Sequence, residues 1–480
     1  MSLFEIESLL PLIVIAGAPV LIMLSIAVKR NHLFTFWFSL IALAAAFFYI
    51  FRTVPLTPVQ VKSIIIVDNF SLFYIGLLTA SVFFVFLLSF NYIEKQPHNR
   101  EEFYILIFLA LLGSSVMASS NHFVSFFLGL EILSVSLYGL ISFIQIKDNS
   151  LEAGIKYLVL ASVSSAFLLF GMALIYAVYG RMDFPGLAEA LEMNGITAVS
   201  LAGFALIIVG AGFKLALVPF HMWTPDIYQA ASAPVSGFIA SVSKGGMFAV
   251  LLRLYTDLNG HQYESLTLLF SILAIASMLT GNLLALLQNN VKRILAYSSI
   301  SHFGYILVAF LAGGKIGIES STFYLSAYFI TILGSFGIVS VLSDYDKEAE
   351  MVDDYRGLFW KRPLLSIVFT AMLFSLAGIP LTAGFIGKYY VLAAGVNSSL
   401  WLLVIVLAGA SVIGLYYYLR IVVSMFSQYD PAAQNERVIK YTFSSSAALG
   451  ILTVLVILFG VYPSRLIEVI QSLAKSFISY

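Results

Sequence analysis

Four ionisable side chains lie inside long apolar runs of this sequence: Glu131, Lys214, Lys244 and Lys388. A charge near the centre of a bilayer costs roughly 2.5 to 3.5 kcal/mol on insertion scales, so a residue of this kind marks a functional site by default. Burial disfavours the charged form of a lysine, and a nearby carboxylate favours it. A carboxylate that moves can therefore switch a lysine between holding and releasing a proton. Alternating acids and bases of this kind indicate proton transfer through a membrane.

Position along the chain suggests an order for these groups. Glu131 lies near the middle of the apolar segment 122–144 and Lys214 at the expected break in the segment 197–220, so they form the candidate coupled pair. Lys244 lies among small residues in SVSKGG, which leave room for water, and Lys388 is the candidate last station. His302 is a candidate bridge between the two halves, because imidazole titrates near neutral pH.

A structural interpretation competes with the proton-transfer interpretation. Lysines near helix ends extend to the membrane surface, and paired buried charges lock helices together. Central depth argues against this for Glu131, Lys214 and Lys244. Lys156 begins an apolar segment, so it is either a relay member or a surface anchor. His221, in PFHMWTPD, is expected to satisfy a helix break rather than to carry protons.

Composition places the chain in the membrane. Of its 480 residues, 60% are hydrophobic and only 10% are charged, and the mean hydropathy is +0.98. Soluble domains carry about 25% charged residues, so no large soluble domain is present. The formal net charge of zero gives no basic face for nucleic acid. The absence of cysteine excludes disulfides, thiolate catalysis and iron–sulfur ligation by this chain.

The apolar stretches predict an all-α polytopic membrane protein with about 14 transmembrane helices. A stretch of about 20 apolar residues crosses the hydrocarbon core as a helix. The predicted spans are 9–28, 33–51, 69–93, 103–120, 122–144, 157–179, 197–220, 234–256, 265–288, 294–313, 320–343, 364–394, 399–426 and 443–462.

The basic residues predict the orientation. Lys and Arg are more frequent in connectors after odd-numbered spans, which are therefore expected to be cytoplasmic. An even number of spans then places both termini on the outer side. The N-terminus has no basic region before its first apolar stretch, which is therefore expected to be a mature span rather than a signal peptide. The largest polar connector, 344–362, is expected to be a solvated cytoplasmic loop.

Two predicted spans contain Gly, Pro and Lys within their apolar runs: GAGFKLALVPFHMWTP at 210–225 and AGIPLTAGFIGKYY at 377–390. Many transporters consist of inverted repeats whose corresponding helices are broken by Gly or Pro. Both segments contain AGF followed by lysine, which predicts that helices 7 and 12 are broken and that Lys214 and Lys388 are counterparts.

The offset between these two lysines extends the repeat hypothesis. It places Glu131 opposite Tyr305, one turn from His302. Two inverted five-helix repeats follow, one made of helices 4–8 and one of helices 9–13. The predicted division is 1–102 (helices 1–3), 103–256 (first repeat), 264–426 (second repeat) and 443–480 (helix 14 and a C-terminal tail).

Four stretches of the sequence resemble the antiporter-like subunits of respiratory complex I, and together with the fourteen-span layout the likeness covers most of the chain. They are SLEAGIKYLVLASVSSAFLLFGMALIYAVYG at 150–180, FKLALVPFHMWTPDIYQAASAPVSGFIASVSK at 213–244, VKRILAYSSISHFGY at 291–305 and GIPLTAGFIGKYYVL at 378–392. The resemblance implies fourteen helices, two inverted five-helix repeats and broken helices 7 and 12.

The resemblance also implies proton-transfer roles for six residues. These are Glu131 with Lys214 as the coupled pair, Lys156 and Lys244 as intermediate stations, His302 on the path between the halves and Lys388 as the far-side station. Within the family, a lysine at the helix-12 position fits the N and L subunits better than the M subunit. The end of the chain at Tyr480 is expected to leave no room for the long lateral helix of subunit L, which favours the N group. In YQAASAPV the sequence departs from the family, which often has Gly and an additional Pro there.

The function implied is proton translocation by a non-redox membrane-arm subunit of an enzyme, an NADH:quinone oxidoreductase. Neighbouring antiporter-like subunits and, through them, the redox arm would be its partners, together with the lipid bilayer of the plasma membrane. Flavin, iron–sulfur clusters and quinone are expected on partner subunits, and neither cofactor nor metal is expected in this chain. The alternatives are a subunit of an Mrp-type cation/proton antiporter or membrane-bound hydrogenase, and a structural membrane subunit without its own proton path.

Overall fold

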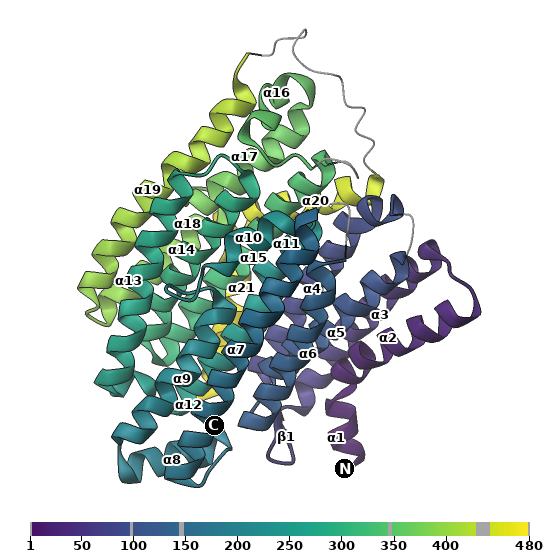
Figure 1. Cartoon of the computed structure of the whole chain (residues 1–480). Helices are drawn as coiled ribbons and strands as arrows, with labels where there is room; N and C mark the ends of the chain where they lie inside the picture. The colour runs from purple at the N-terminus through teal and green to yellow at the C-terminus, as the bar shows by residue number, and fades with distance from the viewer. Residues whose placement is uncertain (1, 97–98, 144–147, 344–347, 429–441, 479–480) are drawn as a thin grey trace.

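The computed structural model describes residues 2–96, 99–143, 148–343, 348–428 and 442–478. The described chain is a bundle of helices, which confirms the predicted all-α class (Figure 1). Its two short strands, β1 (Val59–Val61) and β2 (Ile65–Val67), form an antiparallel hairpin in the connector after the second span.

The helices follow one another with short connectors. The first part contains α1 (Leu3–Ser8), α2 (Leu10–Val28), α3 (His32–Thr53), α4 (Asn69–Glu94), α5 (Arg100–Ala118), α6 (Phe123–Ile141), α7 (Asp148–Tyr179), α8 (Phe184–Asn194), α9 (Ala198–Leu215), α10 (Trp223–Ala230), α11 (Ala233–Phe238) and α12 (Lys244–Asp257). The second part contains α13 (Glu264–Leu286), α14 (Val291–Ala312), α15 (Gly314–Leu342), α16 (Leu358–Lys361), α17 (Pro363–Ala377), α18 (Ala383–Asn397), α19 (Trp401–Phe426), α20 (Phe443–Val461) and α21 (Ser464–Ile478).

The predicted spans correspond to these helices. Within the described residues, 13 helical segments are long and apolar enough to cross a membrane. The remaining predicted span, 364–394, is divided into α17 and α18, each of 15 residues. Figure 1 shows the two ends of the described chain at the same end of the bundle.

The centre of the bundle consists of the continuous segment Ala233–Asp257 and of α14 and α15. The first two are buried by the chain itself along their whole apolar windows, and α15 is buried along nearly all of its window. Outer helices such as α2 and α19 expose most of their length, as expected for surfaces in contact with lipid or partner proteins. Lys244 and His302 therefore lie on the most enclosed helices.

Both predicted broken helices are broken. Pro219 and Pro380 lie in the two breaks, between α9 and α10 and between α17 and α18. A proline lacks the N–H that continues a helix. The AGF tripeptides lie on opposite sides of the breaks, because Lys214 precedes the first break and Lys388 follows the second. The predicted residue-by-residue correspondence of Lys214 and Lys388 is therefore wrong.

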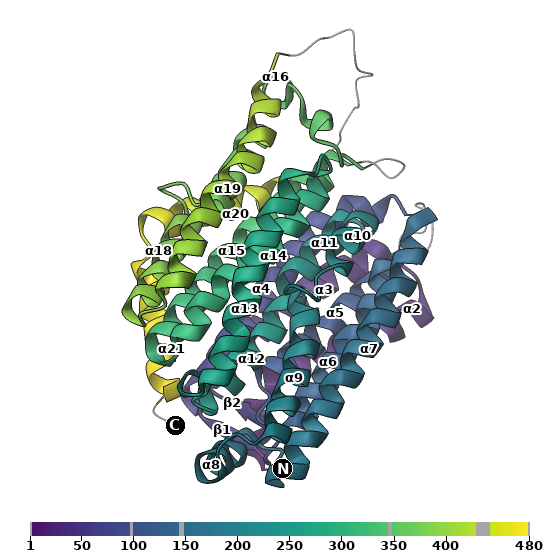
Figure 2. The ribbon, with the colours of Figure 1, turned by 60° about the vertical axis from the view of Figure 1, so that its left-hand side comes forward.

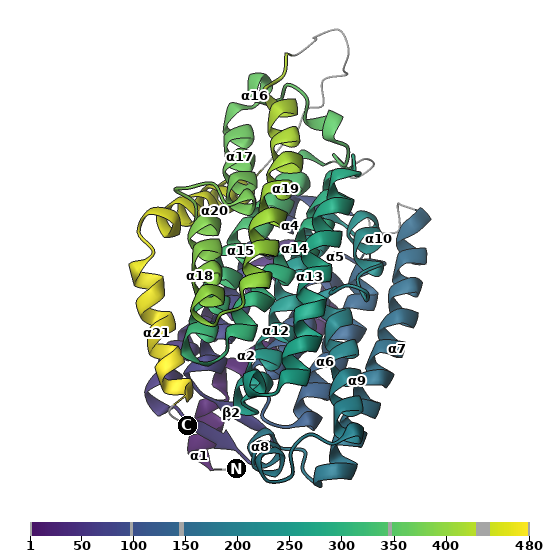
Figure 3. The same cartoon turned by 90° about the vertical axis from the view of Figure 1, so that its left-hand side faces the viewer.

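The C-terminal segment is a helix rather than the expected tail. Figure 3 shows α21 running along the outside of the bundle, where it packs against α4 and α15. Its Phe477 ring stacks on Phe70, 4.6 Å between centroids. The Arg253 guanidinium lies over both rings and donates to both carboxylate oxygens of Asp68, at 2.8 and 2.9 Å. This buried pair joins α12, the start of α4 and α21.

Candidate proton-transfer site

Lys214 and Glu131 lie in the first half of the chain without forming a direct ion pair. Lys214, near the end of α9, is 1% exposed, and its Nζ donates to Tyr157 Oη of α7 at 3.0 Å. Among the described residues, no ion pair within 4.0 Å joins the lysine to Glu131, and Glu131 Oε1 is buried without a hydrogen-bond partner. A neutral hydroxyl therefore holds the lysine, and the carboxylate makes no direct contact with it.

Lys244 begins α12 directly after a π-helical turn at Ile239–Ser243. It is fully buried, and its Nζ donates to Ser299 Oγ of α14 at 2.7 Å. The ammonium also lies 4.9 Å from the centroid of the Phe303 ring, a cation–π distance. Single π turns inside α-helices frequently occur at functional sites. Hydroxyl and aromatic groups surround this ammonium.

His302 lies one turn beyond Ser299 on α14 and is enclosed by tyrosines. Its two ring nitrogens contact Tyr324 Oη at 2.7 Å and Tyr418 Oη at 3.2 Å. Tyr328 lies 5.3 Å from the imidazole, between ring centroids, and donates to Ser299 Oγ at 2.8 Å. Ser299 and Tyr328 thus connect the surroundings of Lys244 with those of His302.

Lys388 lies on α18, and its side chain runs back across the break in helix 12. Its Nζ donates to the carbonyl of Ala377, the last residue of α17, and to Ser411 Oγ of α19, at 2.8 Å each. A cation is favoured at a helix C-terminus by the helix dipole. The ammonium also lies 5.3 Å from the ring centroid of Tyr305, which is on the same helix as His302. The break therefore supplies an uncharged hydrogen-bond acceptor, a free backbone carbonyl, for this lysine.

Lys156 lies apart from these groups. Its side chain is 56% exposed on α7 and pairs with Glu152 one turn earlier, at 2.6 Å. Figures 2 and 3 show α7 at the edge of the bundle, where it packs against α6 and α9. Within this chain the structure does not bring Lys156 together with the buried lysines, and its role as a station stays a prediction.

No metal site accompanies these residues in the described part of the chain, which contains no group of three or more His, Asp or Glu side chains able to hold an ion. The groups that are present, lysine amines, imidazole and hydroxyls, are proton donors and acceptors. The site is suited to moving protons between fixed positions.

Comparison with known proteins identifies the family. Residues 120–414 match the transmembrane family described as NADH:quinone oxidoreductase/Mrp antiporter. Over 475 residues, the chain is 43% identical to NADH-quinone oxidoreductase subunit N of Ectopseudomonas mendocina (strain ymp), across 97% of this chain and 96% of that protein. The chain belongs to the NADH:quinone oxidoreductase/Mrp antiporter family.

Solved structures show how widely the antiporter-family fold is shared. The chain superposes on a chain of respiratory complex I from Thermus thermophilus, solved with bound aureothin, with a TM-score of 0.82 and 29% identity, over 95% of this chain and 98% of that chain. It also superposes on a chain of the Mrp complex from Dietzia sp. DQ12-45-1b, with a TM-score of 0.86, over 100% of this chain and 98% of that chain. At 21% identity, the second likeness shows the fold alone.

The proposed repeats of this antiporter-family chain share a helix–helix contact that sets their register. In each, a glycine on the first helix packs directly on the backbone of the second helix. A Cβ added to Gly113 would lie 2.6 Å from both Gly129 O and Leu133 N, and one added to Gly281 would lie 2.8 Å from Tyr297 O and 2.7 Å from Ser301 N. The number of residues between the glycine and the two residues it contacts is the same in both cases. By this register, α5 and α6 correspond to α13 and α14.

This register corrects the predicted counterpart of Glu131. Glu131 comes two residues after Gly129, and Ser299 comes two residues after Tyr297, so Ser299 takes the place of Glu131 in the second repeat. The expected match with Tyr305 rested on the AGF offset, which the breaks do not support. A carboxylate in one repeat is thus replaced by a hydroxyl in the other.

Sequence reasoning missed the neutral side-chain partners of the lysines: Tyr157, Ser299 and Ser411. Ser299 lies within YSSISHFGY, where only the histidine attracted attention. Serine and tyrosine are common in membrane helices, so residue type alone does not show which of them contact a buried lysine. The register that places Ser299 opposite Glu131 depends on how the helices pack, so no sequence signal was available for it. His221 is buried in the break between α9 and α10, and its expected role at that break stays a prediction.

Proposed function

We propose that this chain is the N-type, proton-translocating subunit of an NADH:quinone oxidoreductase. The observation that carries the proposal is the 43% identity, over nearly the whole chain, to a relative named as that subunit. The buried groups support it, because Lys214, Lys244 and Lys388 each hold their ammonium against neutral partners. Electron transfer in partner subunits would drive the protons.

Each buried lysine acts as a station that holds a proton as ammonium and releases it as amine. At Lys244, the N–H directed at Ser299 Oγ transfers its proton to that oxygen, and the lysine becomes neutral. The Ser299 O–H passes its own proton to Tyr328 Oη, and the Tyr328 O–H, which turns away from Ser299, passes its own toward His302. His302 then accepts a proton at one ring nitrogen and releases one from the other. Lys388 receives the proton last. Glu131 sets the charge of Lys214 by approaching it or retreating from it.

Partner subunits complete the enzyme. Flavin, iron–sulfur clusters and the quinone site belong to them, since this chain has no cysteine for cluster ligation. The chain lies in the plasma membrane, next to other antiporter-like subunits of the membrane arm. Its termini face outward, because the connectors richer in Lys and Arg belong inside. Residues 103–256 and 264–426 act as the two repeats.

A second candidate function is that of an Mrp-type antiporter subunit. The observation in its favour is the fold, since the likeness to the Mrp complex has a TM-score of 0.86. The two functions differ in the energy source, which is electron transfer from NADH in one and an ion gradient in the other. A purely structural subunit, the third candidate, would tolerate neutral substitutions of its buried lysines without loss of pumping.

NADH-driven proton uptake by inverted membrane vesicles tests the proposal. With Lys244→Ala, we expect the complex to assemble and to lose proton uptake. Lys315→Ala is the matched control, because Lys315 is half-exposed and lies 3.7 Å from Glu319 on the same helix. Full uptake by the assembled Lys244→Ala variant would reject the role of Lys244. Absence of NADH-driven uptake in the wild type would favour the antiporter.

A further inference from the structure

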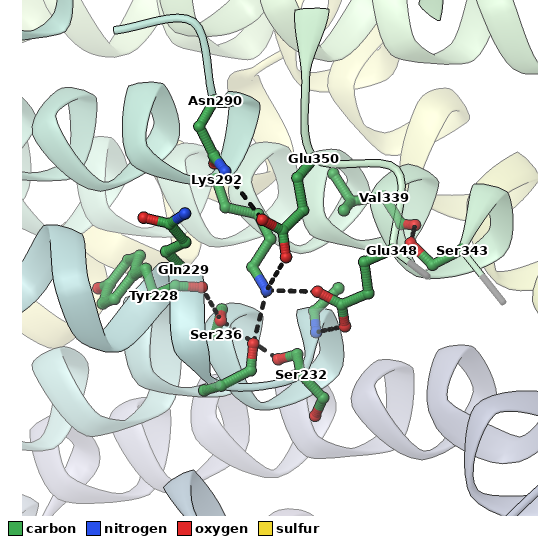
Figure 4. A network of polar contacts seen from close by, with 12 residues as sticks. Tyr228, Gln229, Ser232, Ser236, Asn290, Lys292, Val339, Ser343, Glu348 and Glu350 are labelled. Carbon is green, nitrogen blue, oxygen red and sulfur yellow. Dashed lines mark hydrogen bonds and ion pairs between the residues drawn. The ribbon is translucent and has the colours of Figure 1, made fainter. Parts of the chain in front are cut away.

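A buried lysine outside the row of stations lies at the beginning of α14. Lys292 is fully buried, and its Nζ donates to the carbonyl of Ala231 at 2.6 Å and to Glu348 Oε2 at 2.5 Å (Figure 4). Glu350 Oε1 lies 3.9 Å from the same nitrogen. None of the proposed proton-transfer steps uses this group.

Glu348 completes the cluster from the connector between α15 and α16. It is 4% exposed, so the expected solvated loop is buried at this point; residues 344–347 of that loop lie outside the described residues. Its Oε1 accepts hydrogen bonds from Tyr92 Oη of α4 at 2.8 Å and from the backbone N of Ala233 at 3.2 Å. The carboxylate therefore joins three separate parts of the chain.

The ion pair lies across the junction between the second half of broken helix 7 and the helix that carries Lys244. Ala231 follows the end of α10, and Ala233 begins the helical segment Ala233–Asp257. The cation contacts the carbonyl end of one helix and the anion contacts the amide end of the next, which is the arrangement that both helix dipoles favour. The pair thus fixes where one helix stops and the other starts.

The same helix, α14, holds the Lys244 segment at a second point. Ser299 follows Lys292 by seven residues, about two helical turns, so both lie on one face of α14. Lys292 donates to the carbonyl of Ala231, just before the segment begins, and Ser299 accepts the hydrogen bond of Lys244 near the middle of the segment. Between these contacts lies the π turn at Ile239–Ser243, where the helix is wound differently from an α-helix. A shift at the start of the segment would therefore alter the position of the Lys244 ammonium.

A buried ion pair is weak evidence for a role in stability alone. The desolvation of two charges offsets most of their attraction, and apolar replacements of both partners are often neutral or stabilising. The contribution of such a pair is then to specify one arrangement of the surrounding backbone. Here the specified backbone is the junction that precedes Lys244.

We propose that Lys292 and Glu348 are positioning residues for Lys244. They connect the 348–350 segment, between α15 and α16, with the α10–α11 junction of the proposed first repeat, and they hold the Lys244 ammonium in register with Ser299. This inference rests on the proposed function of Lys244 as a proton station. It adds a contact between the two proposed repeats that lies outside the proton path itself.

The double variant Lys292→Met with Glu348→Met tests the inference, because it removes both charges and leaves none buried without a partner. We expect the complex to assemble, as judged by native gels and NADH:ferricyanide reduction. Proton uptake per assembled complex should fall by about tenfold, because small misplacements of reacting groups carry large rate costs. Lys292→Arg, which keeps the cation, should retain most of the uptake.

Arg293→Met is the matched control. Arg293 is the next residue on α14, and it pairs with Asp226 at 2.7 Å near the surface. The complex with Arg293→Met should assemble and pump as the wild type does. This result would show that the loss in the double variant comes from the buried ion pair and not from removing any charge on α14.

The outcomes distinguish this inference from the proposed function. Wild-type uptake by the assembled double variant, with uptake lost in Lys244→Ala, would overturn the positioning role and leave the proposed function intact. Full uptake in Lys244→Ala would instead remove the basis of both. If neither the double variant nor the near-isosteric Glu348→Gln assembles, the pair acts in folding, and the positioning role is likewise rejected.

Discussion

The two proposed repeats differ at the position where their first and second helices cross. The first repeat has Glu131 there, and the second has Ser299 in the same register. One carboxylate oxygen of Glu131 has no hydrogen bond, whereas Ser299 Oγ accepts a hydrogen bond from the Lys244 ammonium. At this position the first repeat therefore has a buried carboxylate oxygen without a hydrogen bond, and the second has a hydroxyl that contacts a lysine.

This difference suggests that the two repeats have different roles in proton transfer. A carboxylate that approaches or leaves Lys214 changes the charge of that lysine, so the first repeat is suited to control. Lys388 of the second repeat has hydroxyl and carbonyl partners, and Lys244 of the first repeat donates to the Ser299 hydroxyl of the second. These partners add no charge of their own. The second repeat is suited to conduction.

The largest expected effect comes from removing the carboxylate of Glu131. Glu131→Gln keeps the shape of the side chain and should lower NADH-driven proton uptake by about 100-fold, the lower end of the contribution of a proton-transfer group. Uptake is measured in inverted vesicles, with Glu131→Asp as the control that retains the charge. Unchanged uptake in an assembled Glu131→Gln complex would contradict the controlling role of the first repeat.

Removing the hydrogen bond between Lys244 and Ser299 should have a smaller effect. Ser299→Ala leaves the buried Lys244 ammonium without its hydroxyl partner, at a cost of about 1–3 kcal/mol. We expect slower but measurable uptake in the assembled complex. Ser301→Ala is the control, because that hydroxyl donates to a backbone carbonyl of its own helix, at 2.8 Å. Equal effects of the two variants would remove the distinction.

The shared glycine contact predicts matched losses of stability. Gly113→Ala and Gly281→Ala each place a methyl group against the backbone of the neighbouring helix, which should destabilise the subunit by about 1–3 kcal/mol. Gly409→Ala is the control, since a Cβ there meets no atom within 4 Å. Thermal denaturation of the purified complex provides the comparison. A loss for only one of the two glycines would weaken the proposed register.

The smallest effect is expected at the surface of the first repeat. Lys156→Ala removes an exposed ion pair with Glu152, and such pairs contribute little. Within this chain alone, we expect assembly and proton uptake close to those of the wild type. A strong loss of uptake, with intact assembly, would show that a partner subunit brings Lys156 into the path that the family resemblance implies.

Much of the fold could be predicted because lipid restricts the backbone so strongly. Helices must satisfy their own hydrogen bonds, so uncharged stretches reveal spans directly. The predicted span 399–426 is observed as Trp401–Phe426, and 265–288 as Glu264–Leu286. The helix breaks were also predictable, because each of the two predicted spans combines glycine and proline with a lysine, and a proline lacks the N–H that continues a helix. Proline alone is not sufficient, since Pro19 lies inside the continuous helix α2.

Residue correspondences could not be predicted in the same way. The AGF tripeptides are local likenesses, and nothing local fixes how one helix is aligned against another. That alignment depends on close backbone contacts such as Gly113 against Gly129. The exposure of Lys156 was hidden for a related reason, because a helix that is apolar all round does not reveal which face a neighbour covers. The burial of Glu348, in a polar connector, depends on its ion pair with Lys292 of a distant helix.

The sequence by itself determined the membrane class, the spans, the two breaks and the presence of ionisable residues inside them. Each of these follows from the transfer of a chain segment into lipid, which depends on composition over short stretches. Only the tertiary structure decided what holds each charge. Lys214 meets Tyr157, Lys244 meets Ser299 and Lys292 meets Glu348, all between residues more than fifty positions apart. Side-chain hydrogen bonds act over about 3 Å, so these partners exist only once the helices have packed.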